Sequence, residues 1–295
     1  MHYMKIEIEK YIDWKATYAK RASINYKIWL DLFIKVCGDK KIVEYTISDT
    51  VKYNKWLETR YAPCSVQYAT IVLKNFFKYY KMLDIPCISP NLIRLPRIRI
   101  AKSHRAVSES EYEKIMAQIP KDDFRSNRDA LMIQLLWDTG IRISELCDLD
   151  ITQIEETKAS TVISTKKTGK PRIIVWSSET HALLMLYLKK RQELNHTRTT
   201  ALFVGFSNNK SWNERINVRT VQRTIKHYAT DAGLLEKITP HSFRHGWAHK
   251  RREQNAPLAF IQRGLGHVSP VTTFIYQQYN DKEFEANAQG YLQAA

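Results

Sequence analysis

The sequence predicts a mainly α-helical protein with a small β-sheet, divided into two domains by a basic linker. Three observations support this fold class. Apolar residues recur at helical spacing over most of the chain, whereas residues 160–176 contain two β-rich runs. The length of 295 residues is about twice that of a typical domain. With 44% hydrophobic residues and only 9 Gly and 9 Pro, the composition excludes a disordered or collagen-like chain.

Residues 1–97 are expected to form a small helical bundle. Apolar and aromatic residues fall on one face of a helix that begins near Ser65, and a second helix is expected after Ser48. Lys74 and Lys78 lie on the first of these helices and are candidate DNA contacts. An aromatic stripe at helical spacing more often belongs to a packed core, which is the alternative to DNA contact here.

A basic segment at residues 98–106 is expected to link the two domains. It belongs to the stretch RLPRIRIAKSHR, which contains no acidic residue. The basic residues of this stretch that we consider candidate DNA contacts are Arg94, Arg97, Arg99, Lys102 and Arg105. Because basic linkers are often merely solvated, the segment alone does not decide between DNA contact and a solvent-exposed connection.

Residues 107–280 are expected to form the second domain, mostly helical with one β-hairpin. Ser108 and Glu111 form a capping box that opens a helix, and a second helix runs from about Ser126 to Gly140. The hairpin at 160–176 has a basic tip, KKTGKP. Further helices are expected at about 178–193, 217–231, 239–254, 257–264 and 270–278.

The last segment, residues 281–295, carries a short apolar stripe at helical spacing. Its members are Phe284, Ala288, Tyr291 and Leu292. Such a stripe can dock on a neighbouring copy of the chain or fold back on its own domain, and the sequence does not separate the two.

The charge balance points to a polyanion as partner. There are 46 Lys+Arg and 30 Asp+Glu, which give a net charge of +16, and residues 1–100 supply 18 of the basic and 9 of the acidic residues. No apolar stretch is long enough to cross a membrane, so we expect a cytoplasmic protein. The four cysteines contain no C-x-x-C pair, which excludes a zinc ribbon.

Several residues of the second domain have the chemistry of a phosphate site. Arg142 follows a helix end, where a fixed guanidinium suits a phosphate, although taken alone it is better explained as a surface residue or as an ion-pair partner of Glu145. His241 and Arg244 share one face of a helix start, where an anion is favoured. His241, His245 and His249 repeat every four residues, but without a carboxylate ligand nearby we do not expect a metal site.

A tyrosine near the C-terminus is the candidate nucleophile. His267 lies in a glycine-flanked turn, and Tyr276 follows it by nine residues, with Tyr279 as the rival. A tyrosine hydroxyl attacks poorly at neutral pH, so it needs a nearby base and cations that stabilise the charge on its target. The arginine and histidine clusters could supply both.

The order of these motifs resembles the tyrosine recombinase (phage integrase) family. R-x-x-E-L, a hairpin lysine, H-x-x-R, L-G-H and a tyrosine nine residues later follow one another over residues 106 to about 279. The resemblance implies a helical core-binding (SAM-like) domain and an α+β catalytic domain that close around double-stranded DNA as a C-shaped clamp. It also implies an Xer-like enzyme that acts as a tetramer on two DNA sites and needs no cofactor, metal or ATP.

The resemblance also implies a role for each site residue. Arg142 and Arg244 would hold the scissile phosphate, and Lys167, with Lys166 as the rival position, would protonate the leaving 5′ oxygen. His241 would handle the proton of the tyrosine, His267 would hydrogen-bond the phosphate, and Tyr276 would attack. His249 stands where the family commonly has Thr, a change expected to affect packing only.

Two other classes of function use some of the same features. A type IB topoisomerase would use nearly the same groups but would act as a monomer. A non-enzymatic DNA-binding regulator would need only the basic charge and the helical bundle. It would leave the five ordered motifs unexplained.

Overall fold

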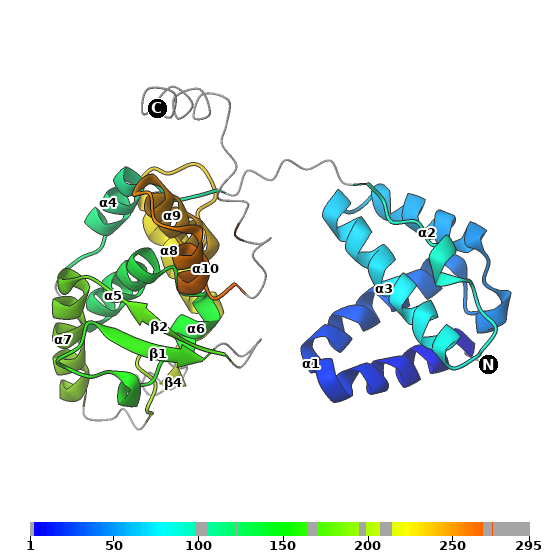
Figure 1. Cartoon of the computed structure of the whole chain (residues 1–295), viewed down its shortest axis with the longest axis horizontal. Helices are drawn as coiled ribbons and strands as arrows, with labels where there is room; N and C mark the ends of the chain where they lie inside the picture. Colours follow the sequence, from blue (N-terminus) through cyan, green and yellow to red (C-terminus); the bar gives the residue numbers. More distant parts are fainter. Residues whose placement is uncertain are drawn as a thin grey trace, which may run out of the picture. The chain divides into compact units, whose positions relative to one another are not determined.

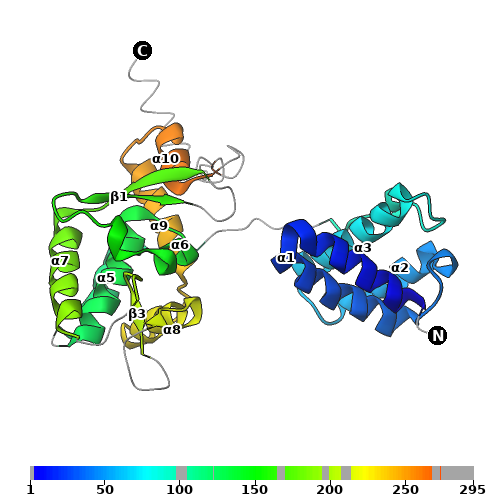
Figure 2. The ribbon, with the colours of Figure 1, turned by 90° about the horizontal axis from the view of Figure 1, so that it is seen from below.

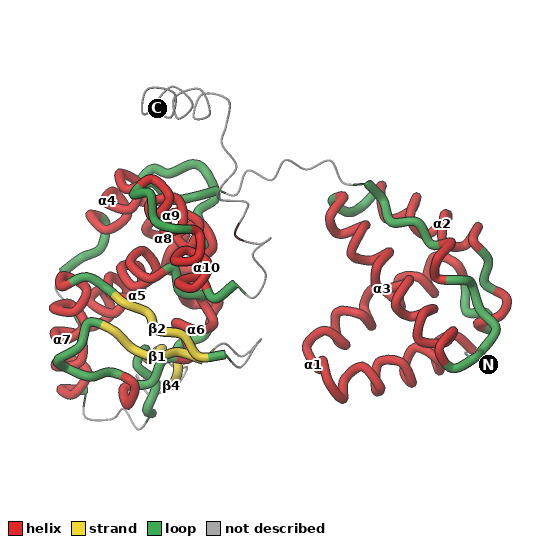
Figure 3. Tube along the Cα trace, in the orientation of Figure 1, coloured by secondary structure: helices red, strands yellow, loops and turns green. Residues whose placement is uncertain are grey.

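The computed structural model describes residues 3–97, 105–121, 123–164, 170–194, 199–206, 214–267 and 273. The chain divides into two compact units, Met1–Lys102 and Ser103–Ala295. This division falls within the segment 98–106, where the sequence predicts a linker. Most described residues are helical, with a few short strands (Figure 3). Among the described residues, no helix is both long enough and apolar enough to span a membrane.

The first unit is a bundle of three helices (Figure 1). They are α1 (Tyr3–Cys37), α2 (Ile47–Glu58) and α3 (Pro63–Met82). Non-helical backbone angles at Ala19 (φ −146°, ψ 54°) divide α1 into two arms. The two helices that the sequence predicts are confirmed as α2 and α3, and each begins one or two residues before the expected start.

The aromatic stripe of α3 forms the core of this bundle. Phe76 and Phe77 are fully buried, and the ring of Phe76 meets that of Tyr11 from α1 edge-on at 5.4 Å. Lys74 is half-buried and Lys78 is exposed. The stripe therefore packs the bundle, and the lysines that remain accessible are the groups through which α3 could meet a polyanion.

The second unit is built around α5. Its helices are α4 (Glu109–Ala117), α5 (Phe124–Thr139), α6 (Ile143–Asp148), α7 (Ser178–Glu193), α8 (Val218–Asp231), α9 (Pro240–Glu253) and α10 (Leu258–Leu265). Its strands are β1 (Ser160–Ser164), β2 (Pro171–Val175), β3 (Val204–Gly205) and β4 (Glu214–Arg215). The central helix α5 lies between α7 and α9 and also contacts α4, α6, α8 and β2 (Figure 1).

Side-chain caps set the helix starts as the sequence predicts. The Ser108 hydroxyl accepts a hydrogen bond from the Glu111 N–H, and the Thr239 hydroxyl accepts one from the Ser242 N–H. Helix α5 begins at Phe124, two residues earlier than predicted, because Asp123 caps it. Its C-cap is Gly140, whose φ of +58° glycine adopts without strain.

The predicted hairpin is confirmed as the antiparallel pair β1–β2, with Ile163 opposite Arg172. Ile163 and Ile174 face the core, whereas Val162, Ile173 and Val175 are exposed. The hairpin lies beside α10 (Figure 2). The hairpin tip with Lys166 and Lys167 and the tail at 281–295 lie outside the described residues, as does the helix expected at 270–278 except for Thr273.

Gly246 of α9 allows the entering chain to run against this helix. The N–H of Val107 donates to the Ser242 carbonyl at 3.0 Å, and a Cβ on Gly246 would stand 2.4 Å from the Val107 carbonyl oxygen. This contact is too short for carbon and oxygen, and a backbone oxygen cannot rotate away as a flexible side chain could.

Gly246→Ala should therefore destabilise the second unit. The overlap should cost about 1–3 kcal/mol, in spite of the roughly 1 kcal/mol that alanine gains over glycine in a helix. Thermal denaturation would measure the loss. Gly205→Ala is the matched control, because its new Cβ would meet other atoms only at 3.6 Å or more. Equal melting temperatures for the two variants would contradict the close contact.

Candidate active site

Arg142 is held in place at the start of α6. Its backbone N–H and its Nη1 each donate to the carboxylate of Glu145 at 3.0 Å, and its Nη2 donates to the Gly266 carbonyl at 3.2 Å. The ion pair with Glu145 is thus present. It does not remove Arg142 from phosphate binding, because these two side-chain bonds use only two of the five N–H donors of the guanidinium.

Arg244 lies on the first turns of α9 and is 5% exposed. Its Nη1 donates to the Gly140 carbonyl at 2.7 Å, and its Nη2 donates to the Leu265 carbonyl. It therefore connects the end of α5 with the end of α10. Because a guanidinium stays protonated in proteins, Arg244 adds a fixed positive charge at this point.

Arg172 is a third arginine of this cluster, for which the sequence motifs indicate no role. It lies on β2 with its side chain turned inward, and its Nη1 and Nη2 donate to the two carboxylate oxygens of Glu145 at 2.9 and 2.7 Å. Its Nε donates to the Gly264 carbonyl at 3.0 Å. The alternation of inward and outward residues along β2 was the signal that could have identified it.

The three arginines converge on the C-terminal end of α10. Arg172, Arg244 and Arg142 bind the carbonyls of residues 264, 265 and 266 in turn. The last carbonyls of a helix have no partner within the helix and carry a partial negative charge. The end of α10 therefore holds three cations together, and His267 is the residue that follows.

Two glycines allow this close approach. A Cβ on Gly264 would stand 2.4 Å from the Trp247 ring, and one on Gly266 would stand 3.0 Å from the Arg172 side chain. Gly266 also has a φ of +61°, which ends α10. The G-L-G-H sequence thus has a packing reason as well as the motif character that the sequence analysis noted.

Glu145 is an acidic side chain that accepts hydrogen bonds from two of these arginines. It is 6% exposed. Burial raises the pKa of its carboxyl, but the hydrogen bonds and charges of Arg172 and Arg142 outweigh this, so the pKa is lowered to about 2. The carboxylate stays ionised, and the three arginines and one glutamate leave the cluster positively charged.

His241 and His267 are placed beside these charges. His241 is exposed at the start of α9, yet desolvation of its ring, followed by the charges of Arg244 and Arg142, lowers its pKa. Burial and the same two arginines, with Arg172, lower the pKa of His267 to about 4. The Nδ1 of His267 lies 2.8 Å from the hydroxyl of the buried Thr273. His267 is therefore neutral at pH 7.

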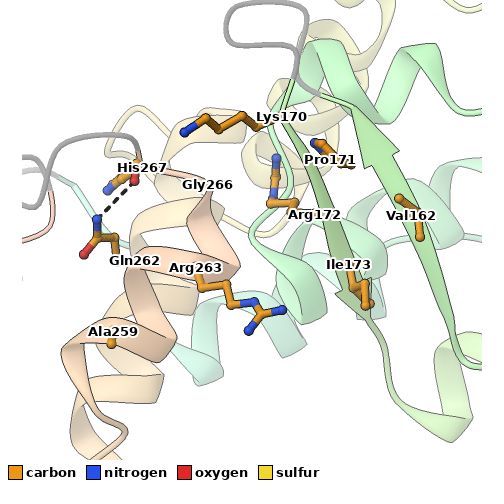
Figure 4. Close-up of a pocket in the computed structure, with 10 residues that line it drawn as sticks. All are labelled: Val162, Lys170, Pro171, Arg172, Ile173, Ala259, Gln262, Arg263, Gly266 and His267. Carbon is orange, nitrogen blue, oxygen red and sulfur yellow. Dashed lines mark hydrogen bonds between the residues drawn. The ribbon is translucent and has the colours of Figure 1, made fainter.

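A cavity of about 520 Å³ opens beside this cluster, between β2 and α10. Lys170 and Arg172 line it from the strand side, and Gly266 and His267 line it from the helix end (Figure 4). Gln262 donates to the His267 carbonyl at 3.3 Å, which fixes the turn after α10. A pocket with this lining suits an anion such as a phosphate group.

The structure thus brings Arg142, His241, Arg244 and His267 together. Lys167, Tyr276 and the rival positions Lys166 and Tyr279 lie outside the described residues, as do Arg99 and Lys102. Among the described residues there is no group of three or more His, Cys, Asp or Glu that could hold a metal ion.

The candidate DNA contacts of the linker differ in their surroundings. Arg94 and Arg97 are exposed. Arg105 is half-buried and forms ion pairs with Glu111 and Glu236. Its guanidinium therefore fastens the end of the linker to the second unit.

Helix α8 has a basic face that the sequence analysis did not single out. Its inner face buries Val221, Ile225 and Tyr228. The exposed residues on the other side include Arg219, Gln222, Arg223 and Lys226. The regular spacing of the buried residues was a signal that could have identified this face.

Comparison with known proteins decides the family. The phage integrase family matches residues 105–283, more than half of the chain. The chain belongs to this family. Tyrosine recombinase XerA of Pyrococcus furiosus is 31% identical to it over 242 residues, which cover 81% of this chain and 79% of that protein. Tyrosine recombinase XerC of Thermodesulfovibrio yellowstonii is 31% identical over 207 residues, or 69% and 67%.

The solved structures show the same fold. The integrase of the transposon Tn1549, in complex with a circular-intermediate DNA, matches with a TM-score of 0.78 over 98% of this chain and 99% of that one, at 17% identity. The chain is a site-specific tyrosine recombinase, an enzyme that cuts and rejoins DNA strands through a 3′-phosphotyrosine intermediate. None of these three relatives is a topoisomerase or a regulator.

The low pKa of His267 predicts a loss of stability in acid. Between pH 6.5 and pH 4 the unfolded chain binds a proton at this histidine, whereas the folded site does not, so stability falls as the pH falls through this window. At pH 5 the difference should amount to about 2 kcal/mol. Urea denaturation at pH 7 and pH 5 would measure it, with His267→Gln as comparison. The prediction is wrong if both proteins lose the same stability.

Proposed function

We propose that the cluster at the end of α10 binds the scissile phosphate of double-stranded DNA. Arg142 and Arg244 hold its non-bridging oxygens, and His267 donates a hydrogen bond to it. Tyr276 is the nucleophile, His241 accepts its proton, and Lys167 protonates the leaving group. One observation carries this proposal. The side chains of Arg244 and Arg142 bind the carbonyls of residues 265 and 266, directly before His267, so the three groups lie together.

The chemistry of the proposed step balances without a cofactor. The Tyr276 oxygen forms a bond to phosphorus as the bond from phosphorus to the 5′ oxygen breaks. The tyrosine proton passes to His241, and a proton from Lys167 reaches the 5′ oxygen. Neutral His241 can act as a base at pH 7, and its lowered pKa supports this role. The fixed arginine charges stabilise the extra negative charge of the transition state.

Tyr276→Phe should bind DNA normally but form no covalent adduct, because only the attacking oxygen is removed. Denaturing gel electrophoresis of the enzyme with a labelled duplex would detect the adduct. Tyr279→Phe is the matched control and should still form it. If Tyr276→Phe still formed the adduct and Tyr279→Phe did not, the nucleophile would be Tyr279.

The basic surfaces of the two units are proposed to hold the DNA on either side of the cut. Lys74, Lys78, Arg94 and Arg97 belong to the first unit and are accessible. In the second unit, the exposed face of α8 offers Arg219, Arg223 and Lys226, so we add it to the DNA-contacting surface. Because its substrate is cellular DNA, we place the enzyme in the cytoplasm.

Replacing Arg97, Arg99 and Lys102 by Ala should weaken the salt dependence of DNA binding. Each lost phosphate contact lowers the slope of log affinity against log salt by roughly 0.9, so the slope should flatten by up to about 3 units. Sequence preference should survive, because phosphate contacts do not read bases. Binding titrations between 50 and 200 mM salt would measure the slope.

The control for this experiment removes two positive charges from helix α7 and leaves the linker unchanged. The double variant Lys189→Ala, Lys190→Ala on α7 should keep the slope of the original protein. A linker variant with an unchanged slope would show that the segment is merely a solvated connection.

The enzyme is proposed to assemble as a tetramer on two DNA sites, with residues 281–295 docking on a neighbouring copy. A groove of about 900 Å³ between β2, α9 and α10 could accept this tail. It is lined by the exposed apolar side chains of Ile173, Val175 and Phe260 and has Arg251 and Arg263 at its rim. The tail carries apolar residues together with three acidic residues and one lysine. The two surfaces are thus complementary in both polarity and charge.

Tyr291→Ala with Leu292→Ala should preserve binding of single sites but abolish the complex of two duplexes, because the tail loses its apolar side chains. Phe260→Ala in the groove should have the same effect. Native gels and light scattering would measure the assembly, with Gln293→Ala as the control in the tail. Normal assembly of both apolar variants would contradict docking in this groove.

A further inference from the structure

Arg172 lies on a strand beside the cavity, yet its side chain is buried and held by several hydrogen bonds. Its side chain is 6% exposed, and its guanidinium donates three hydrogen bonds, two to Glu145 and one to the Gly264 carbonyl. These acceptors belong to α6 and α10, whereas Arg172 belongs to β2. One side chain therefore fastens the hairpin to the two elements that carry Arg142 and His267.

Glu145 links Arg172 to Arg142. Its Oε1 accepts from Arg142 at 3.0 Å and from Arg172 at 2.9 Å. Its Oε2 accepts from the Arg142 backbone at 3.0 Å and from Arg172 at 2.7 Å. The two arginines share one carboxylate, so the position of β2 and the position of Arg142 are set by the same buried group.

The packing at Gly266 leaves little room for β2 to shift. A Cβ placed on Gly266 would stand 3.0 Å from both the Cδ and the Nη1 of Arg172, which shows how closely the backbone at the end of α10 approaches this side chain. Ile163 pairs with Arg172 across the hairpin, so both strands are fixed at this level. The pair of Ile163 and Arg172 is one residue pair away from the last pair before the tip, Ser164 and Pro171.

We propose that Arg172 is a positioning residue for strand cleavage, which acts by holding the β1–β2 hairpin so that Lys167 reaches the leaving 5′ oxygen. Lys167 precedes Arg172 by five residues, which span at most about 18 Å of extended chain. The inference rests on the proposed role of Lys167. Arg172 itself is directed at Glu145 and Gly264 and does not need to touch the DNA.

The test compares two substrates for Arg172→Lys and Lys167→Ala. One substrate is an ordinary duplex, and the other carries a sulfur in place of the 5′ bridging oxygen, whose thiolate leaves without a proton. Arg172→Lys keeps a positive charge beside Glu145 but loses the bidentate geometry. It should cut the ordinary duplex at least tenfold more slowly than the original protein and the sulfur duplex within about threefold of it, as Lys167→Ala should.

A matched control separates this effect from loss of a buried arginine. Arg191 is 6% exposed, and its Nη2 donates to the carbonyls of Thr199 and Ala201 at 2.8 and 3.0 Å. Arg191→Lys removes comparable bonds, which join α7 to residues 199 and 201 and not to the hairpin. The ratio of the cleavage rates on the ordinary and the sulfur duplex should be the same for Arg191→Lys as for the original protein, even if the variant melts at a lower temperature.

The results separate the positioning role of Arg172 from the proposed role of Lys167 as general acid. Equal slowing of Arg172→Lys on both substrates, while sulfur rescues Lys167→Ala, would overturn the positioning role and leave the function of Lys167 intact. An ordinary rate in Arg172→Lys would also overturn it. If sulfur fails to rescue Lys167→Ala, the general-acid assignment is wrong, and the inference falls with it.

Discussion

The C-terminal end of α10 is the feature on which the site depends. A helix end presents carbonyl oxygens that the helix cannot satisfy, and here the carbonyls of residues 264, 265 and 266 each bind a different arginine. The arginines come from β2, α9 and the start of α6, which are far apart in the sequence. Without this common acceptor, three like charges would repel one another in a buried space. The helix end thus converts an unfavourable cluster into a fixed positive surface.

The charges at the end of α10 also influence the protonation of the neighbouring titratable groups. Glu145 is buried, which by itself favours the protonated form, but two arginines keep its pKa near 2. One carboxylate does not neutralise three guanidinium groups. Burial of the rings, followed by the charges of Arg244 and Arg142, lowers the pKa of His241 and His267. The surroundings that suit a phosphate therefore also favour the unprotonated form of both histidines.

Much of this architecture follows from the sequence, because caps, periodicity and short motifs act locally. Ser108 and Thr239 mark helix starts through their side-chain hydroxyls and Gly140 marks a helix end through its backbone, and Arg142, Arg244 and His267 stand in recognisable motifs. Arg172 could not be assigned in the same way, because its partners Glu145 and Gly264 are 27 and 92 residues away in the chain. The long helix α1 was not predicted either. Its kink at Ala19 interrupts the regular spacing on which such a prediction relies.

The contact between Val107 and α9 determines how force enters the second unit. The chain that arrives from the linker is joined to the Ser242 carbonyl through the N–H of Val107, and Gly246 lets it lie directly on the helix surface. Ser242 stands between His241 and Arg244 in the sequence, so the chain enters the unit at the helix that carries both residues. Arg105 also pairs with Glu111 and Glu236, so tension along the linker reaches α9 and the partners of Arg105 together. A length change before Arg105 would leave these attachments intact, and the pull would still reach the helix that bears His241 and Arg244.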